Sequence, residues 1–191
     1  ISVQRILVHR NVYDEFVRRF VARVGKLKTG DPLDPATDVG PMIDEAAARR
    51  AEDWIGAAVR DGARVEYGGG RTRAMLEPTV LTRTSPSQQV NCEEVFAPVT
   101  TVTPYAEFDE AVARINATAY GLQAGIFTRD VRRLMQAWER LDVGGVMGND
   151  IPSFRVDRMP YGGSKASGLG REGVRYAIQE MTEPRLLTLQ T

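Results

Sequence analysis

The sequence alternates between short stretches rich in β-branched residues and longer amphipathic stretches with helical spacing. Expected strands cover residues 2–9, 64–67, 76–81, 99–102, 124–127, 145–147 and 185–189, and expected helices cover 11–27, 44–62, 108–115, 131–141 and 171–181. This alternation favours an α/β fold, a mostly parallel sheet flanked by helices through right-handed crossovers. Ligands of such sheets bind beyond the carboxyl ends of the strands, where the loops gather.

Single residues predict how some of these elements begin and where they lie. Asn11 is expected to cap the first helix, with Asp14 three residues later, and Asp44 is expected to cap the second, which closes at Gly62. Pro78 lies inside the expected strand 76–81. Because proline cannot donate a hydrogen bond to a neighbouring strand, we expect this strand at an edge of the sheet.

Composition places the chain among ordinary globular proteins and argues against several partners. Of the 191 residues, 42% are hydrophobic and 26% are charged, which is enough for a substantial core. Lys and Arg total 25, as do Asp and Glu, so the zero net charge argues against nucleic acid or an anionic membrane as partner. No stretch is long and apolar enough for a spanning helix. One Cys and one His exclude a disulfide framework and the usual zinc sites, and we expect no metal and a cytoplasmic location.

The first residue is Ile rather than Met, and it runs directly into the first expected strand. A secretory signal would show a basic region, an apolar region and a cleavage pattern, none of which is present. We therefore expect the chain to be a piece of a longer protein.

A glycine-rich stretch marks the last third of the chain, with five glycines between residues 162 and 173. Gly168 to Gly173 matches the dinucleotide-binding pattern G-x-G-x-x-G, but that pattern needs a preceding strand and an acidic residue about 20 positions later. Here the preceding residues are typical of a loop, and the sequence ends before such an acid. Lys165 also lacks the neighbours of a P-loop lysine. We expect these glycines to shape a loop.

The single thiol and the single imidazole have poor surroundings for catalysis. Cys92 precedes Glu93 and Glu94, and neighbouring carboxylates disfavour the reactive thiolate. His9 lies at a strand end with no identifiable Ser or Cys partner for a catalytic triad. We expect structural roles for both.

Glu94 and Phe96 are better candidates for ligand binding. A carboxylate can accept hydrogen bonds from vicinal hydroxyls while an aromatic ring two residues later packs against a flat ring. The alternative is a surface glutamate beside a core phenylalanine.

Arg155 is a second candidate, in a loop that also contains Phe154 and Tyr161. A guanidinium beside aromatic rings suits an anionic or hydroxylated ligand, which it binds through forked hydrogen bonds. The alternative is a salt bridge to Asp157 or to another acidic residue.

Taken together, the sequence resembles the aldehyde dehydrogenase superfamily. The matching stretches are Ile1–Arg5, Gly40–Glu45, Glu93–Val99, Tyr120–Thr128 and Pro160–Glu172, in the family's order and spacing. The resemblance implies that residues 1–182 form the catalytic domain and that residues 183–191 form a strand that joins a neighbouring subunit. It also implies a homodimer or homotetramer.

The resemblance further implies a reaction in which a cysteine thiolate attacks an aldehyde, a hydride passes to NAD or NADP, and the thioester is hydrolysed. The nucleophile is expected immediately before Ile1, and the general base and the domain that mainly binds the cofactor are expected further upstream. No catalytic residue is therefore expected in this chain, which should be inactive alone. Glu94 is implied to hold the nicotinamide ribose hydroxyls, Phe96 to lie beside the nicotinamide, and Tyr161 to line the substrate pocket.

The Phe154–Arg155 pair and the run Met159 to Tyr161 most resemble the branch that acts on lactaldehyde, phosphonoacetaldehyde or glyceraldehyde phosphate. We therefore expect a small aldehyde with a hydroxyl or anionic group, bound by Arg155, Phe154 and Tyr161. Two alternatives stay open. One is an acylating enzyme that passes the acyl group to coenzyme A, and the other is a non-enzymatic oligomerisation or binding module.

Overall fold

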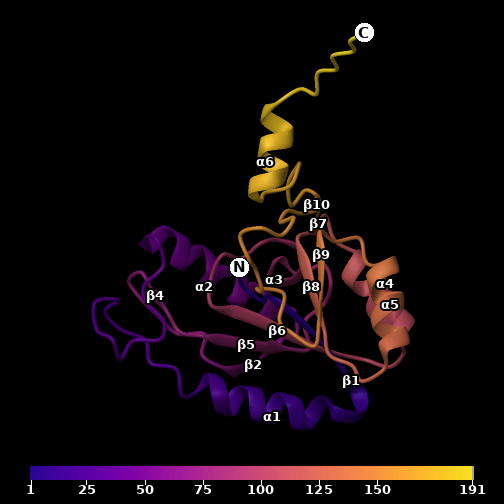
Figure 1. The fold of residues 1–191 in the computed structure, drawn as a ribbon. Coiled ribbons are helices and arrows are strands. Elements are labelled where there is room, and N and C mark those ends of the chain that lie inside the picture. Colours follow the sequence, from indigo (N-terminus) through magenta and orange to yellow (C-terminus); the bar gives the residue numbers. More distant parts are fainter. Residues whose placement is uncertain (191) are drawn as a thin grey trace. The chain divides into compact units, whose positions relative to one another are not determined.

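The computed structural model describes residues 1–190 and divides into two compact units. The first unit contains residues 2–111, and the second contains residue 1 and the residues from Val112 onward. Helix α4 (Phe108–Asn116) runs across the boundary in the chain. Both units combine strands with helices (Figure 1), so the predicted α/β class is confirmed.

The first unit is built on a four-stranded sheet with the order β1-β6-β5-β2. Its strands are β1 (Arg5–His9), β2 (Arg64–Tyr67), β5 (Thr79–Thr82) and β6 (Val99–Tyr105), and a separate hairpin is formed by β3 (Arg71–Thr72) and β4 (Met75–Leu76). Strand β6 pairs in parallel with both β1 and β5, whereas β2 runs antiparallel to β5 at the edge. The predicted mostly parallel sheet is therefore confirmed.

Helices cover both faces of this sheet. Successive residues of β5 point to opposite faces and so pack against different helices. The helical elements of the unit are η1 (Arg10–Val12), α1 (Tyr13–Val24), α2 (Glu45–Arg60) and α3 (Gln89–Cys92). Leu81 packs in a core cluster with Ile55 of α2, and Val80 packs in another cluster against Phe16 of α1. Figure 1 shows α1 and α2 on opposite sides of the sheet.

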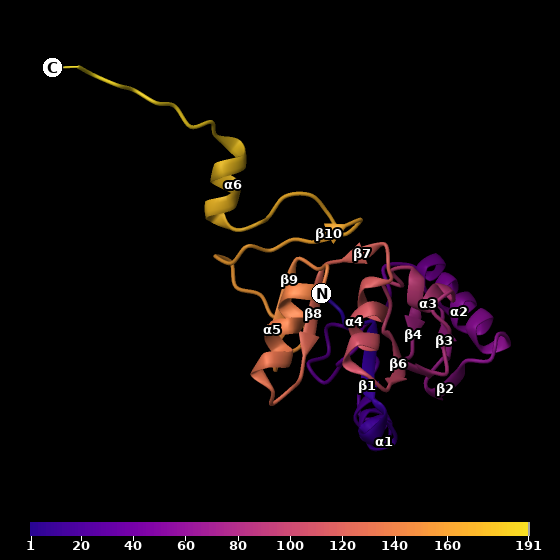
Figure 2. The same cartoon turned by 90° about the vertical axis from the view of Figure 1, so that its right-hand side faces the viewer.

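The second unit contains two small sheets. Its elements are β7 (Tyr120–Gly121), β8 (Gln123–Ile126), α5 (Val131–Arg140), β9 (Gly145–Gly148), β10 (Ser164–Lys165) and α6 (Val174–Met181). Strands β8 and β9 pair in parallel, and α5 connects them and lies beside them (Figure 2). Strands β7 and β10 pair antiparallel, which brings the glycine-rich stretch beside Tyr120 and Gly121.

Two predicted helix starts had different outcomes. Asp44 caps α2 as predicted, since its carboxylate accepts a hydrogen bond from the Ala47 N–H at 2.7 Å. Asn11 does not cap α1, which begins at Tyr13, and that prediction was wrong. Asn11 lies inside η1, where its N–H donates to His9 Nδ1, so the histidine caps η1, while Val12 is the N-cap of α1.

The predicted strand 76–81 is divided between two strands in different sheets. Pro78 lies between β4 and β5, and β5 pairs on both sides, with β2 and with β6. The expected edge position was therefore wrong. Because Pro78 lies outside the strand, its missing N–H removes no hydrogen bond from the sheet.

The C-terminal region contains one short helix followed by extended chain. Gly173, with a φ of 114° that favours glycine, is the N-cap of α6. The helix therefore starts at Val174, three residues later than the start at residue 171 that the sequence predicts. Residues 183–190 form neither helix nor strand, so the pairing of 185–189 with another subunit stays a prediction. Thr191, at the end of that predicted segment, lies outside the described residues. Among residues 1–190, no helix combines the length and the apolar character needed to cross a bilayer.

Candidate functional site

The segment between α3 and β6, residues 93–98, is called here the Glu94–Phe96 loop. Val95 is fully buried in the core with α2, while Glu94 and Phe96 on either side of it are exposed. Phe96 leaves 78% of its surface exposed, so it is not a core residue of this unit. An exposed carboxylate two residues from an exposed aromatic ring fits a ligand that carries hydroxyls beside a flat ring.

The side chain of Gln4 holds this loop from the side of β1. Its Nε2 donates to the carbonyls of Val90 and Glu93 at 3.0 and 2.7 Å, and its Oε1 accepts the Val95 N–H at 3.1 Å. The amide thus uses both of its N–H hydrogens and its oxygen on a single segment of backbone.

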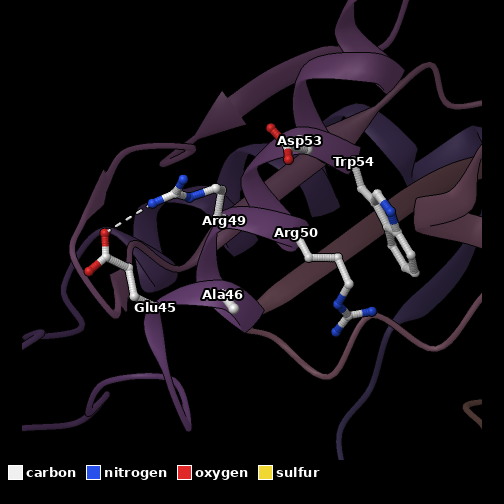
Figure 3. Close-up of a pocket in the computed structure, with 6 residues that line it drawn as sticks. All are labelled: Glu45, Ala46, Arg49, Arg50, Asp53 and Trp54. Carbon is white, nitrogen blue, oxygen red and sulfur yellow. Dashed lines mark hydrogen bonds and ion pairs between the residues drawn. The ribbon is translucent and has the colours of Figure 1, made fainter.

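Arg50 of α2 holds the same loop through the carbonyl of Val95. Its Nη2 donates to the Val95 carbonyl at 2.8 Å, and its guanidinium lies 4.7 Å from the centroid of the Trp54 ring, a cation–π contact. Figure 3 shows the two side chains next to each other at an open pocket. Arg49 points elsewhere and pairs with Glu45.

The loop keeps Phe96 in a strained backbone conformation. Its φ is 50°, in the left-handed region that bulky side chains rarely adopt. The following residues fasten the chain, because the Thr79 N–H donates to the Pro98 carbonyl at 2.7 Å and the Val99 N–H donates to the Ala97 carbonyl at 2.7 Å. Strain that is held in this way is frequent at ligand sites.

In the second unit, the predicted site residues Arg155 and Tyr161 come together. The Arg155 guanidinium lies 4.4 Å from the centroid of the Tyr161 ring, and its Nη2 donates to Glu172 Oε2 at 2.8 Å. This ion pair is at the surface, with 41% and 64% of the two side chains exposed. The salt bridge considered from the sequence therefore exists, with Glu172 rather than Asp157.

Backbone pairing explains why these residues meet. The Tyr161 N–H donates to the Glu172 carbonyl at 3.1 Å, and the Glu172 N–H donates to the Tyr161 carbonyl at 2.6 Å. Phe154, the residue before Arg155, has an exposed ring, and its carbonyl accepts a long hydrogen bond of 3.5 Å from Gln123 Nε2.

The glycine-rich stretch folds closely on itself. A Cβ added to Gly163 would lie 2.4 Å from the Cβ of Ser167, and Gly170 has a φ of 70°. Arg171 Nη1 donates to the carbonyls of Gly163 and Gly170 at 2.9 and 2.7 Å. The contacts support the expectation that these glycines shape a loop.

Cys92 and His9 have local structural partners. The half-buried Cys92 thiol donates to the Ser87 carbonyl at 3.5 Å. His9 accepts the Asn11 N–H at 3.3 Å and makes an edge-to-face contact with Tyr105, 5.4 Å between centroids. Within residues 1–190, no three His, Cys, Asp or Glu side chains are grouped closely enough to hold a metal ion.

Comparison with known proteins gives the family. The model of the aldehyde dehydrogenase family matches residues 1–187. The chain belongs to the aldehyde dehydrogenase family. It is 47% identical over 189 residues to 3-sulfolactaldehyde dehydrogenase of Priestia aryabhattai, covering 99% of this chain and 40% of that protein. It is 40% identical over 191 residues to lactaldehyde dehydrogenase of Methanococcus aeolicus, covering 100% and 41%.

Solved structures of aldehyde dehydrogenases have the same fold. ALDH21 from Physcomitrella patens, in complex with the reaction product succinate, has a TM-score of 0.93 at 48% identity, over 94% of this chain and 37% of that one. GapN from Methanocaldococcus jannaschii, complexed with NADP, has a TM-score of 0.91 at 41% identity, over 95% and 39%. The chain spans about 40% of the length of the curated relatives it matches. The branch predicted from the sequence is confirmed by these relatives.

Three residues that support these sites were not predicted from the sequence: Gln4, Arg50 and Glu172. Arg50 lies one helical turn before Trp54, a spacing that puts both side chains on one helix face and that indicates a shared environment. Gln4 gives a weaker signal, as an uncharged polar residue directly before an apolar strand. Glu172 gave none, because a charged residue in a glycine-rich loop is most often solvated.

Proposed function

We propose that this aldehyde dehydrogenase chain is part of a longer NAD(P)-dependent enzyme that oxidises a small hydroxylated or anionic aldehyde to its carboxylic acid. The observation that carries the proposal is that Glu94 and Phe96 are exposed on a loop whose backbone is held in place, in a chain of this family. The match to about 40% of the relatives' length supports a larger whole. In it, the nucleophilic cysteine lies immediately before Ile1, and the base and cofactor domain lie further upstream.

Glu94 and Phe96 bind the nicotinamide half of NAD or NADP. When bound, the cofactor supplies the acceptor for the hydride. The Glu94 carboxylate accepts hydrogen bonds from the two ribose hydroxyls, and hydrogen bonds to a carboxylate are among the stronger ones. The Phe96 ring packs against the nicotinamide and excludes water from one face of it. Both side chains are exposed and available for these contacts.

In the proposed reaction, the upstream cysteine thiolate attacks the aldehyde carbon, the hydride leaves that carbon, and water hydrolyses the resulting thioester to the acid. The residues of this chain make none of these bonds. They orient the reactants, an effect that is worth several orders of magnitude in rate when the geometry is fixed.

Arg155, with Tyr161 and Phe154, binds the polar end of the aldehyde. The relatives' names include 3-sulfolactaldehyde and lactaldehyde, and the ALDH21 structure holds succinate, so hydroxyl or anionic groups recur among them. The surface pair of Arg155 with Glu172 is worth only about 0–1 kcal/mol. An anionic substrate can therefore take the place of the Glu172 carboxylate beside the same guanidinium.

Substrate preference tests this role in the full-length protein. In Arg155→Met we expect kcat/KM for a sulfonated or carboxylated aldehyde to fall about 10- to 100-fold, and that for an uncharged aldehyde of similar size to change less than about twofold. Arg158→Met is the matched control, because Arg158 is an exposed cation of the same loop. An equal loss on both aldehydes would remove Arg155 from substrate recognition.

The reaction itself is tested by comparing two proteins. The full-length protein should reduce NAD+ or NADP+ when an aldehyde is added, and residues 1–191 alone should not. Aldehyde-dependent reduction by the isolated chain would contradict the placement of the nucleophile upstream. A requirement for coenzyme A in the full-length assay would contradict the hydrolytic reaction.

We also propose that residues 183–191 pair with a neighbouring subunit in a cytoplasmic homodimer or homotetramer. Leu186, Leu187 and Leu189 are 88%, 79% and 79% exposed in the chain, an apolar surface of the kind that subunits cover. Sedimentation of the full-length protein, with and without the residues after Thr182, should show a smaller assembly for the shortened form.

A further inference from the structure

Hydrogen bonds to the sheet fix the backbone of Gln4. It directly precedes β1, and its carbonyl accepts the Thr101 N–H at 2.8 Å. The carbonyl of Val3, one residue earlier, accepts a hydrogen bond from Thr100 Oγ1 at 3.0 Å. The backbone that carries the Gln4 amide is thus tied to the interior strand β6, and the amide starts from a rigid base.

The three hydrogen bonds of the Gln4 amide have a particular arrangement around Glu94. The Glu93 carbonyl belongs to the peptide unit before Glu94, and the Val95 N–H belongs to the peptide unit after it. Gln4 bonds both of them, at 2.7 and 3.1 Å. Because these two peptide planes define the backbone dihedral angles of Glu94, the amide fixes the direction in which the carboxylate leaves the chain.

The same amide ties the loop to helix α3. Its second donor bond goes to the Val90 carbonyl at 3.0 Å. Val90 and Val95 are both fully buried, so the segment between them is anchored at each end. The exposed Glu94 side chain therefore leaves the backbone from a fixed attachment point.

We propose that Gln4 is a positioning residue for the nicotinamide cofactor, acting through the backbone of Glu94. The inference rests on the proposed role of Glu94 as the ligand of the ribose hydroxyls. Two adjacent hydroxyls require both carboxylate oxygens at defined positions, and a loop held in that geometry loses little entropy when the cofactor binds. Without the amide, the same loop has to be ordered at the moment of binding, which weakens affinity.

The first readout is independent of the cofactor and of activity. In the full-length protein, Gln4→Met keeps the length of the side chain and removes all three hydrogen bonds. We expect amide hydrogen exchange in the peptide that contains Val95 to become about tenfold faster. Gln88→Met is the matched control: Gln88 also donates to a carbonyl and accepts an N–H, but these are from Ala58 and Ser85. It should leave exchange at Val95 unchanged.

The second readout is the dissociation constant of NAD+ or NADP+, measured by calorimetry without aldehyde. We expect it to rise about tenfold in Gln4→Met and not at all in Gln88→Met. If Gln4→Met fails to fold, Gln4→Asn, whose amide is one methylene too short to make all three bonds, carries the same comparison against Gln88→Met. Faster exchange with an unchanged dissociation constant would make Gln4 a structural residue only and overturn the proposal.

A double-mutant cycle separates this inference from the proposed function. Glu94→Gln alone should weaken cofactor binding, and Gln4→Met added to Glu94→Gln should weaken it little further, because both changes act on one contact. If Glu94→Gln leaves the dissociation constant unchanged, the role of Glu94 is wrong, and with it the role of Gln4. If Glu94→Gln weakens binding but Gln4→Met does not, or if the two effects simply add, only the inference about Gln4 is wrong.

Discussion

The two candidate sites of this chain are held in different ways. The Glu94–Phe96 loop is fixed through its backbone, by a buried valine and by the side chains of Gln4 and Arg50. The site around Arg155 is fixed through its side chain, by an ion pair with Glu172 and by contact with the Tyr161 ring, both at the surface.

The difference matches the two proposed ligands. The enzyme binds the same cofactor in every turnover. A cofactor site that is rigid before binding therefore gains affinity and does not need to adapt to other ligands. A substrate pocket has to differ between enzymes that act on different aldehydes, and a surface ion pair can be exchanged at little energetic cost. Three predictions test this contrast and one tests the sheet that carries the first site, in order of decreasing effect on stability.

The largest effect is expected at the buried anchor. Val95→Ala removes two methyl groups from a fully buried position and should lower the free energy of unfolding by about 2–3 kcal/mol. Val156→Ala, beside Arg155, is the matched control, because Val156 is 41% exposed and its truncation should change stability by less than about 0.5 kcal/mol. Thermal and urea unfolding of the full-length protein measure both. Equal effects would contradict the contrast between the sites.

The next effect concerns two neighbouring arginines of α2. Arg50→Met removes a charged donor from the Val95 carbonyl and should destabilise the protein by about 1.5–3 kcal/mol. Arg49→Met breaks only an exposed pair with Glu45, and should cost less than about 0.5 kcal/mol. The same unfolding measurements apply. A loss at Arg49 as large as that at Arg50 would show that charge, rather than the contact with the loop, is responsible.

A smaller effect on the free energy of unfolding is expected at alkaline pH, from Tyr13 of the first unit. Burial, and then the charge of Glu66, raise the pKa of Tyr13 above its ordinary value of 10.0, and its hydroxyl donates to the Val102 carbonyl at 3.2 Å. Since the folded state keeps the proton where the unfolded chain has lost it, stability is full below pH 10 and falls as the pH rises through the folded pKa. Tyr13→Phe should lose about 1 kcal/mol at neutral pH and should flatten the alkaline decline. An unchanged decline in unfolding scans from pH 8 to 11 would assign it to another group.

The smallest effect on stability is expected at the Arg155 site. Glu172→Gln should change the free energy of unfolding by less than about 1 kcal/mol, because the pair with Arg155 is exposed. It should nevertheless lower the KM for an anionic aldehyde about two- to threefold, since the guanidinium no longer has a competing carboxylate. Steady-state kinetics with charged and uncharged aldehydes test this point, and a KM that rises for the charged one would mean that Glu172 orients Arg155 rather than competing for it.

Local patterns were enough to predict the elements whose causes are local. The strand 64–67 was predicted with its exact bounds, and Asp44 was recognised because a cap acts within one helical turn. Asn11 was misassigned because a short 3-10 helix, capped by His9, precedes α1, and the N-cap of α1 is Val12, which makes no side-chain capping bond. Pro78 was misread because the sequence does not show that the chain changes sheets beside it.

The candidate site was predicted in part for the same reason. Glu94, Phe96, Arg155 and Tyr161 stand out through their neighbours in sequence and through the family resemblance. Gln4 lies 91 positions from Val95, and the contact between them follows only once β1 and β6 pair. A residue such as Gln4, whose contact depends on the pairing of strands, cannot be recognised from local sequence patterns. The ligand-binding candidates that it holds in place can.

The central claim is that the Glu94–Phe96 loop receives the nicotinamide half of the cofactor. The most direct test is a structure of the full-length protein with NAD+ or NADP+ bound. We predict the Glu94 carboxylate within hydrogen-bond distance, about 2.6–3.2 Å, of the nicotinamide ribose hydroxyls, with the Phe96 ring against the nicotinamide and the three Gln4 bonds intact. A cofactor whose ribose is held elsewhere, with Glu94 still in solvent, would contradict the account.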